Sequence, residues 1–109
     1  MIKVTIYQSS EGEILGFAIQ GHAGYAESGS DIVCAAVSVL AQNTVNSIEQ
    51  FTQDGFSADV DEEEGGLYLK MEPGYSKESK LLLDSMVLGL TDIQRSYGKS
   101  YIRIAFKEV

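Results

Sequence analysis

Residues 2–20 read IKVTIYQSSEGEILGFAIQ, and this stretch sets the fold because it contains two strand patterns with a turn between them. Hydrophobic and polar side chains alternate over 2–7, which is the two-residue period of a half-buried strand. Residues 9–12, Ser-Ser-Glu-Gly, have the composition of a turn, and residues 14–20 are mostly hydrophobic. We therefore expect the chain to begin with a β-hairpin.

The rest of the chain continues with two helices and three strands. The expected elements are a helix over 32–51, strands over 56–60 and 67–71, a helix over 77–97 and a strand over 102–107. Hydrophobic residues recur every three or four positions in the helices and every second position in the strands. The order ββαββαβ with short hairpins predicts an α+β fold, in which two helices cover one face of a mostly antiparallel sheet. A length of 109 residues predicts one domain, 1–109.

Each predicted helix carries a hydrophobic stripe of the kind with which an amphipathic helix packs on a core. In the first helix the stripe comprises Val33, Val37, Leu40, Thr44, Ile48 and Phe51. In the second helix it comprises Leu83, Met86, Leu90, Ile93 and Tyr97. For the second helix, the pattern leaves open whether the stripe faces the sheet, a second subunit or both.

The composition excludes several classes of function. The chain has 8 Lys and Arg against 16 Asp and Glu, a net charge of −8, which disfavours direct binding to nucleic-acid phosphates. No hydrophobic run is long enough to span a membrane, and the first residues lack the features of a signal peptide. We therefore expect a cytoplasmic protein with no membrane partner. One Cys and one His exclude an intrachain disulfide and a multi-Cys metal site, so we expect no metal and no cofactor.

Cys34 is the first candidate for chemistry. If Asp31 caps the first helix, Cys34 lies in the first helical turn. There, unpaired backbone N–H groups and the helix dipole favour the deprotonated, nucleophilic thiolate. The competing interpretation is that Cys34 fills space as a small hydrophobic residue, since its neighbours are Val33 and Ala35.

His22 is the second candidate, twelve residues before Cys34 at the end of a predicted strand. A neutral imidazole near the thiol could take its proton and later protonate a leaving amine. The alternative is an exposed histidine without a role. Asp31 could cap the helix or orient His22. Ser38 shares a helical face with Cys34 and could bond near the site or back to the Cys34 carbonyl.

Two further segments have both a structural and a functional interpretation. The glycine-rich residues 21–30 indicate a loop with unusual backbone angles, and Tyr25 within it could line a hydrophobic pocket or pack in the core. The acidic run 61–64 is typical of a solvated hairpin tip. Its functional alternative is attraction of a basic substrate.

Two runs together resemble the motif of the ribosomal-processing cysteine protease family called Prp. They are Gly21-His22-Ala23-Gly24-Tyr25-Ala26 and Gly29-Ser30-Asp31-Ile32-Val33-Cys34-Ala35-Ala36-Val37-Ser38. The chain length and the order of elements agree with this family over essentially the whole chain. The resemblance implies a cytosolic endopeptidase, usually a homodimer. Such enzymes remove an N-terminal extension from the large-subunit ribosomal protein L twenty-seven, with bulky apolar residues before the cut.

The resemblance also implies roles for individual residues. Cys34 would be the nucleophile and His22 its general base. The segment that covers the site and orders around the substrate would include Gly24, Tyr25, Gly29 and Ser30. Asp31 and Ser38 match further motif positions and would support the site. Backbone N–H groups at the helix start would form an oxyanion hole, and the acidic surface would suit a basic ribosomal protein.

Two other functions are compatible with the same residues. A non-catalytic ribosome-associated binding or assembly module would use the glycine-rich loop to hold a partner, with His22 and Cys34 in structural roles. Another thiol chemistry, such as acyl transfer or redox sensing, would use Cys34 alone, although the absence of a second Cys disfavours an intrachain disulfide switch. The motif match favours the protease over both.

Overall fold

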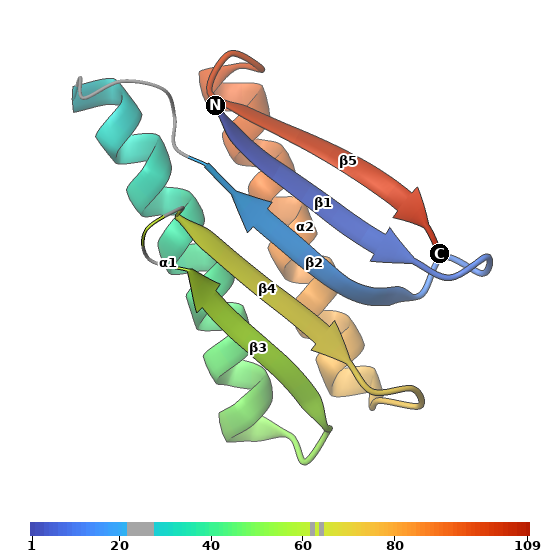
Figure 1. The fold of residues 1–109 in the computed structure, drawn as a ribbon. Helices are drawn as coiled ribbons and strands as arrows, with labels where there is room; N and C mark the ends of the chain where they lie inside the picture. The colour runs from blue at the N-terminus through green and yellow to red at the C-terminus, as the bar shows by residue number, and fades with distance from the viewer. Residues whose placement is uncertain (22–27, 62, 64) are drawn as a thin grey trace.

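The structure, a computed structural model, describes residues 1–21, 28–61, 63 and 65–109, with only the backbone described for 28–31. Its elements are β1 (Ile2–Gln8), β2 (Ile14–Gln20), α1 (Ser28–Phe51), β3 (Phe56–Asp61), β4 (Gly66–Met71), α2 (Lys77–Tyr97) and β5 (Ile102–Glu108). Figure 1 shows the strands as one twisted sheet with both helices behind the same face. The predicted α+β fold with the order ββαββαβ is confirmed.

The sheet has the strand order β3-β4-β2-β1-β5. β1 and β2 form the predicted antiparallel hairpin, in which Val4 lies opposite Ile19 and Ile6 opposite Phe17. β4 pairs antiparallel with both β2 and β3, whereas β5 pairs parallel with β1. This parallel pairing is possible because α2 carries the chain from β4 across the sheet to its far edge. The N-terminal hairpin therefore lies in the middle of the sheet, and the end of β2 leads toward α1.

The core lies between the sheet and the two helices. Its most deeply buried side chains include Ile6 and Phe17 from the sheet, Val33 and Ile48 from α1, and Leu83, Met86 and Leu90 from α2. Leu83, Met86 and Leu90 of the α2 stripe thus face the sheet and pack in this core, which answers the question that the sequence left open, whereas Tyr97, the last residue of α2, is 43% exposed. Among the described residues, neither helix is both long and hydrophobic enough to cross a membrane.

Phe51 departs from its predicted stripe, because its side chain is 76% exposed. It is the last residue of α1. A periodic pattern predicts which side of a helix faces the core, but it does not predict where along the helix the core ends.

α1 begins at Ser28, four residues before the predicted start at Ile32. The prediction placed the cap at the last polar residues before the hydrophobic stripe. A helix can nevertheless extend a turn beyond its packed face, and Ser and Gly are well tolerated at its start. The predicted N-cap role of Asp31 is therefore wrong. The backbone of Gly29 and Ser30 is helical rather than part of the predicted loop.

Asp54, just after α1, is hydrogen-bonded to the first turn of α2. Its carboxylate accepts the backbone N–H of Ser76 at 3.0 Å and the hydroxyl groups of Ser76 and Ser79. Ser76 is the N-cap of α2, and Ser79 is fully buried. The hydrogen bonds from Ser76 and then Ser79 lower the pKa of Asp54 below its ordinary value of 3.8, because they stabilise the ionised form.

We expect Asp54→Asn to lower the melting temperature at pH 7, because the amide cannot accept all three hydrogen bonds. A folded-state pKa below the unfolded value stabilises the protein above the unfolded pKa, and this contribution is lost as the pH falls through the folded pKa. The difference between wild type and variant should therefore shrink as the pH falls below 3.8. Thermal unfolding followed by circular dichroism from pH 7 to pH 2 measures this. Asp59→Asn, at an exposed position of β3, is the control, and a pH-independent difference for Asp54→Asn would contradict the assignment.

Candidate active site

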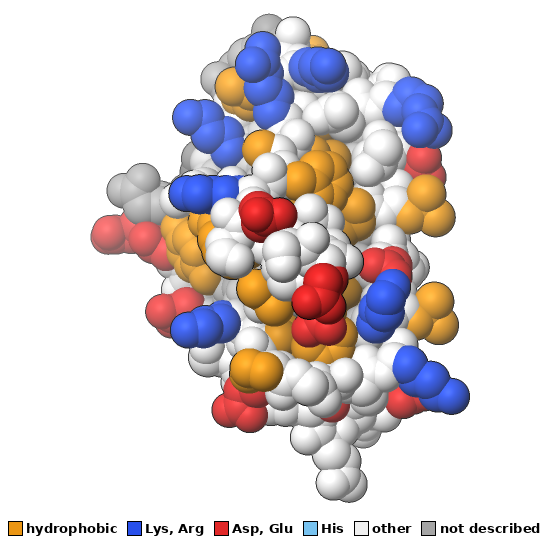
Figure 2. Space-filling view, turned by 90° about the vertical axis from the view of Figure 1, so that its right-hand side faces the viewer, with side chains coloured by type: hydrophobic (Ala, Val, Ile, Leu, Met, Phe, Trp, Pro, Cys, Tyr) orange, Lys and Arg blue, Asp and Glu red, His pale blue; other side chains and the backbone are white. Residues whose placement is uncertain are grey.

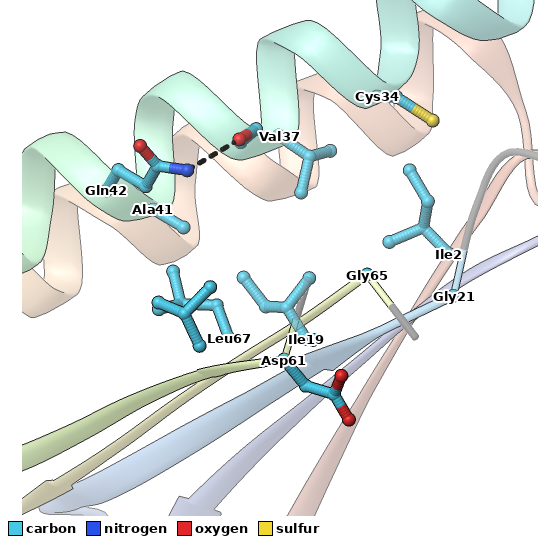
Figure 3. Close-up of a pocket in the computed structure, with 13 residues that line it drawn as sticks. Ile2, Ile19, Gly21, Cys34, Val37, Ala41, Gln42, Asp61, Gly65 and Leu67 are labelled. Carbon is cyan, nitrogen blue, oxygen red and sulfur yellow. Dashed lines mark hydrogen bonds between the residues drawn. The ribbon is translucent and has the colours of Figure 1, made fainter. Parts of the chain in front are cut away.

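A cavity of about 330 Å³ opens between α1 and the end of the sheet, with Cys34 in its wall (Figure 3). This volume is at the lower end of the range for ligand sites, about 300–1,000 Å³. α1 contributes Cys34, Val37, Ser38, Ala41 and Gln42. Their spacing of three and four residues places them along one face of the helix.

The floor of the cavity is hydrophobic. Ile2 from β1, Ile19 from β2 and Val37 from α1 are almost completely buried, and Figure 3 shows their side chains filling the space between α1 and the sheet. Val60, near the end of β3, also lines the cavity and is 60% exposed. The edge strand therefore leaves a hydrophobic side chain uncovered beside the cavity, which suits it to an apolar group of a ligand.

Cys34 is half-buried, and Figure 3 shows its Sγ projecting from α1 on the side where Ile2 and Gly21 lie. It is the seventh residue of α1, counted from Ser28, so its predicted place in the first turn is wrong. Only the first four N–H groups of a helix lack a partner within the helix. The helix-start N–H groups that were expected to form an oxyanion hole therefore lie at residues 28–31, before Cys34, and their role stays a prediction.

Gly21 directly follows Gln20, the last residue of β2, and lines the same cavity as Cys34. Its φ of 87° lies in the left-handed region, and a Cβ at this position would lie 2.7 Å from the Met1 carbonyl oxygen. Only glycine satisfies both conditions without strain. His22 follows Gly21 directly in the sequence but lies outside the described residues.

The structure describes some of the remaining predicted site residues and leaves others outside its described range. Gly24 and Tyr25 lie outside the described residues, and the side chain of Asp31 is not described. Their predicted roles therefore stay predictions. Ser38 does line the cavity with Cys34, one helical turn further along α1.

Gln42 is a cavity residue that the sequence reasoning missed. Its Nε2 donates a hydrogen bond to Ser38 Oγ at 2.9 Å, and both side chains are exposed at the mouth of the cavity. The signal that could have found Gln42 is its spacing, because Cys34, Ser38 and Gln42 follow one another at intervals of four residues.

Asp61 is the member of the acidic run, among its described residues, that lies at this cavity. Figure 3 shows its carboxylate pointing away from α1. This direction follows from the sheet, because Asp61 alternates with Val60. Across the described ranges, no three His, Cys, Asp or Glu side chains come together as metal ligands.

Comparison with known proteins relates this chain to one family. The family model described as cysteine protease Prp matches residues 1–103. The ribosomal processing cysteine protease Prp of Bacillus subtilis is 34% identical over 110 residues, which covers 95% of this chain and 96% of the relative. The protein of that name from Staphylococcus aureus is 31% identical, covering 98% and 100% of the two chains.

Solved structures that resemble this chain belong to the same family. The crystal structure of the essential ribosomal processing protease Prp from S. aureus with a covalently linked product peptide has a TM-score of 0.89 and 31% identity. A second structure of that protease, with a substrate peptide, has a TM-score of 0.89 and 30% identity. Each match covers 98% of this chain and 100% of the other.

Proposed function

This chain belongs to the cysteine protease Prp family, and on that premise we propose that it removes the N-terminal extension of ribosomal protein L twenty-seven during ribosome maturation. Cys34 is the nucleophile of this endopeptidase and His22 its general base. The observation that carries the proposal is the cavity. It brings the Cys34 thiol to the same hydrophobic pocket as Gly21, and Gly21 is bonded to His22.

The reaction begins when His22 takes the proton from Cys34. The thiolate then attacks the carbonyl carbon of the scissile bond, and the carbonyl oxygen of the tetrahedral intermediate carries the negative charge. Collapse of this intermediate breaks the C–N bond, and His22 gives its proton to the leaving amine. A water molecule, deprotonated by His22, hydrolyses the remaining thioester and regenerates the thiol.

The supporting residues have separate roles in this proposal. Asp31 orients His22, and Ser38 borders the substrate cavity. Gly24, Tyr25, Gly29 and Ser30 belong to the segment that covers the bound peptide, and the last two of them lie at the start of α1. Exclusion of water and of unfitting peptides by such a cover limits cleavage to the intended substrate.

The cavity and the charge support the proposed substrate. A hydrophobic floor of Ile2, Ile19 and Val37 suits the bulky apolar residues that precede the cut. A net charge of −8 favours the approach of a basic ribosomal protein. The S. aureus relative has been crystallised with a substrate peptide and with a covalently linked product peptide, which supports peptide binding and covalent catalysis in this family.

The test is cleavage of a synthetic peptide that carries the N-terminal extension of L twenty-seven, followed by mass spectrometry. Wild type should cut it at one bond. His22→Ala should lower kcat/KM by about 10²–10⁴-fold, the usual contribution of a general acid–base group. Binding of the peptide without any cleavage by wild type would instead support a non-catalytic ribosome-associated module.

We also propose a cytoplasmic homodimer, as the family resemblance implies. Figure 2 shows hydrophobic side chains gathered on the side of the molecule formed by β5 and α2. Phe106 on β5 and Leu81 and Leu88 on α2 are each more than half exposed. A second copy that covers them would remove this surface from water. Analytical ultracentrifugation should then give about twice the chain mass of 11.9 kDa, and a monomer would contradict the dimer.

A further inference from the structure

We propose that Gln42, held in place by Ser38, binds the main chain of the peptide substrate about three to four residues before the cut, at the spacing set by the helix. The inference rests on the proposed function and adds a substrate-binding residue to it. The cavity selects apolar side chains, whereas Gln42 holds the backbone that carries them.

The position of Gln42 along α1 sets which substrate residue it meets. Gln42 follows Cys34 by eight residues, and a helix rises about 1.5 Å per residue, so the two are about 12 Å apart along the axis. An extended peptide advances about 3.3 Å per residue. A peptide that reacts at Cys34 and runs along α1 therefore reaches Gln42 about three to four residues from the scissile bond.

The hydrogen bonding of Gln42 sets what it can recognise. Its Nε2 is engaged by Ser38 Oγ at 2.9 Å, and its Oε1 accepts no hydrogen bond from the described residues. The Oε1 atom is therefore the group that remains for a ligand, and its complement is an N–H donor. Because Ser38 already restricts the glutamine side chain, less rotational freedom is lost when the peptide binds.

The surroundings favour a main-chain donor over a charged side chain. Gln42 is exposed at the mouth of the cavity, above buried Val37 and Ala41. The Asp61 carboxylate points away from α1 (Figure 3). A peptide whose apolar side chains enter the cavity must keep its backbone at the mouth, beside Gln42. Every non-proline residue supplies the required N–H, so this contact tolerates sequence variation.

Steady-state kinetics with two peptides test the proposal. One peptide has six residues before the cut and the other has two. Gln42→Ala should raise KM for the long peptide by about 3- to 10-fold, the range of one neutral hydrogen bond, with kcat within twofold of wild type. Both constants for the short peptide should be unchanged. Gln50→Ala, at another exposed glutamine of α1, is the matched control and should behave as wild type with both peptides.

Ester substitution identifies the partner atom. In two further long peptides, the backbone N–H of the third or the fourth residue before the cut is replaced by an ester oxygen. One ester should raise KM for wild type as much as Gln42→Ala does, and should add nothing when combined with Gln42→Ala. If the ester and Gln42→Ala raised KM by factors that multiply in the combination, the assigned contact would be contradicted.

Two other results would overturn the inference. One is a KM of Gln42→Ala for the long peptide that lies within twofold of the wild-type value. The other is a KM that rises by the same factor for the short peptide as for the long one. Fluorescence anisotropy with Cys34→Ala and Cys34→Ala/Gln42→Ala tests the same contact without cleavage. Weaker binding of the long peptide by Cys34→Ala/Gln42→Ala than by Cys34→Ala supports the contact. Equal affinity of the two variants contradicts it. Cleavage by wild type separately tests the proposed function.

Discussion

Cys34→Ala should abolish cleavage of the L twenty-seven peptide, with kcat/KM lowered by at least about 10³-fold. The reason is chemical, because alanine removes the atom that forms the covalent bond to the substrate. The chain has one cysteine, so no second thiol can replace it. The fold should survive, because the side chain is only half-buried and lies at the edge of the core, beside a cavity. Peptide cleavage by mass spectrometry and melting by circular dichroism measure the two effects.

Cys34→Ser is the matched variant, because it keeps the size of the side chain but replaces the thiol with a much weaker nucleophile. It should be as inactive as Cys34→Ala while it still binds the peptide. Alkylation with iodoacetamide adds an independent check, since modification of the one thiol should remove activity in parallel with the gain in mass. Equal cleavage rates for wild type and Cys34→Ala would show that the proposed mechanism is wrong.

Phe17→Ala should have the largest effect on stability, a loss of about 3–5 kcal/mol in the free energy of unfolding. Phe17 is 1% exposed and is the largest of the fully buried side chains. It lies on β2 near the middle of the sheet, opposite Ile6 on β1 and Leu69 on β4. Truncation would leave a cavity that these neighbours, held by strand pairing on both sides, can only partly fill.

Urea unfolding followed by circular dichroism measures this loss. Phe51→Ala is the matched control, because it makes the same chemical change at a side chain that is 76% exposed. It should change the free energy of unfolding by at most about 0.5 kcal/mol, as is usual for surface substitutions. If both variants lost the same free energy, the burial of Phe17 would not be the source of its contribution.

Local patterns predicted the elements well and their ends less well. Alternation over residues 2–7 predicted β1, because one face of a strand is buried and the other is not. The start of α1 at Ser28 is an end that the local pattern did not predict. α1 starts there rather than at Ile32, because helical hydrogen bonds can extend past the last buried residue. That shift moved Cys34 from the first helical turn to the second, so the unpaired N–H groups of the helix start lie before it in the chain.

Within the candidate site, the motif identified Cys34 and Ser38, which line one cavity, but it gave no sign of Gln42. Ser38 and Cys34 were found because they lie inside a continuous run that resembles a family motif. Gln42 lies outside this run, and its role depends on where the sheet meets α1. Gly21 was found through the motif, but the reason for a glycine there comes from the tertiary structure. The Met1 carbonyl leaves no space for a Cβ at this position.

By itself, the sequence determined the α+β class and the order of elements, because both follow from residues close together in the chain, and its motif singled out the thiol that we propose as the nucleophile. Tertiary structure alone decided that β5 joins β1 in parallel, that Asp54 is hydrogen-bonded to Ser76, and that residues from α1 and the sheet enclose one cavity beside Cys34. These contacts join residues far apart in the chain, and they form only when helices and strands pack. A local period of two or 3.6 residues carries no information about them.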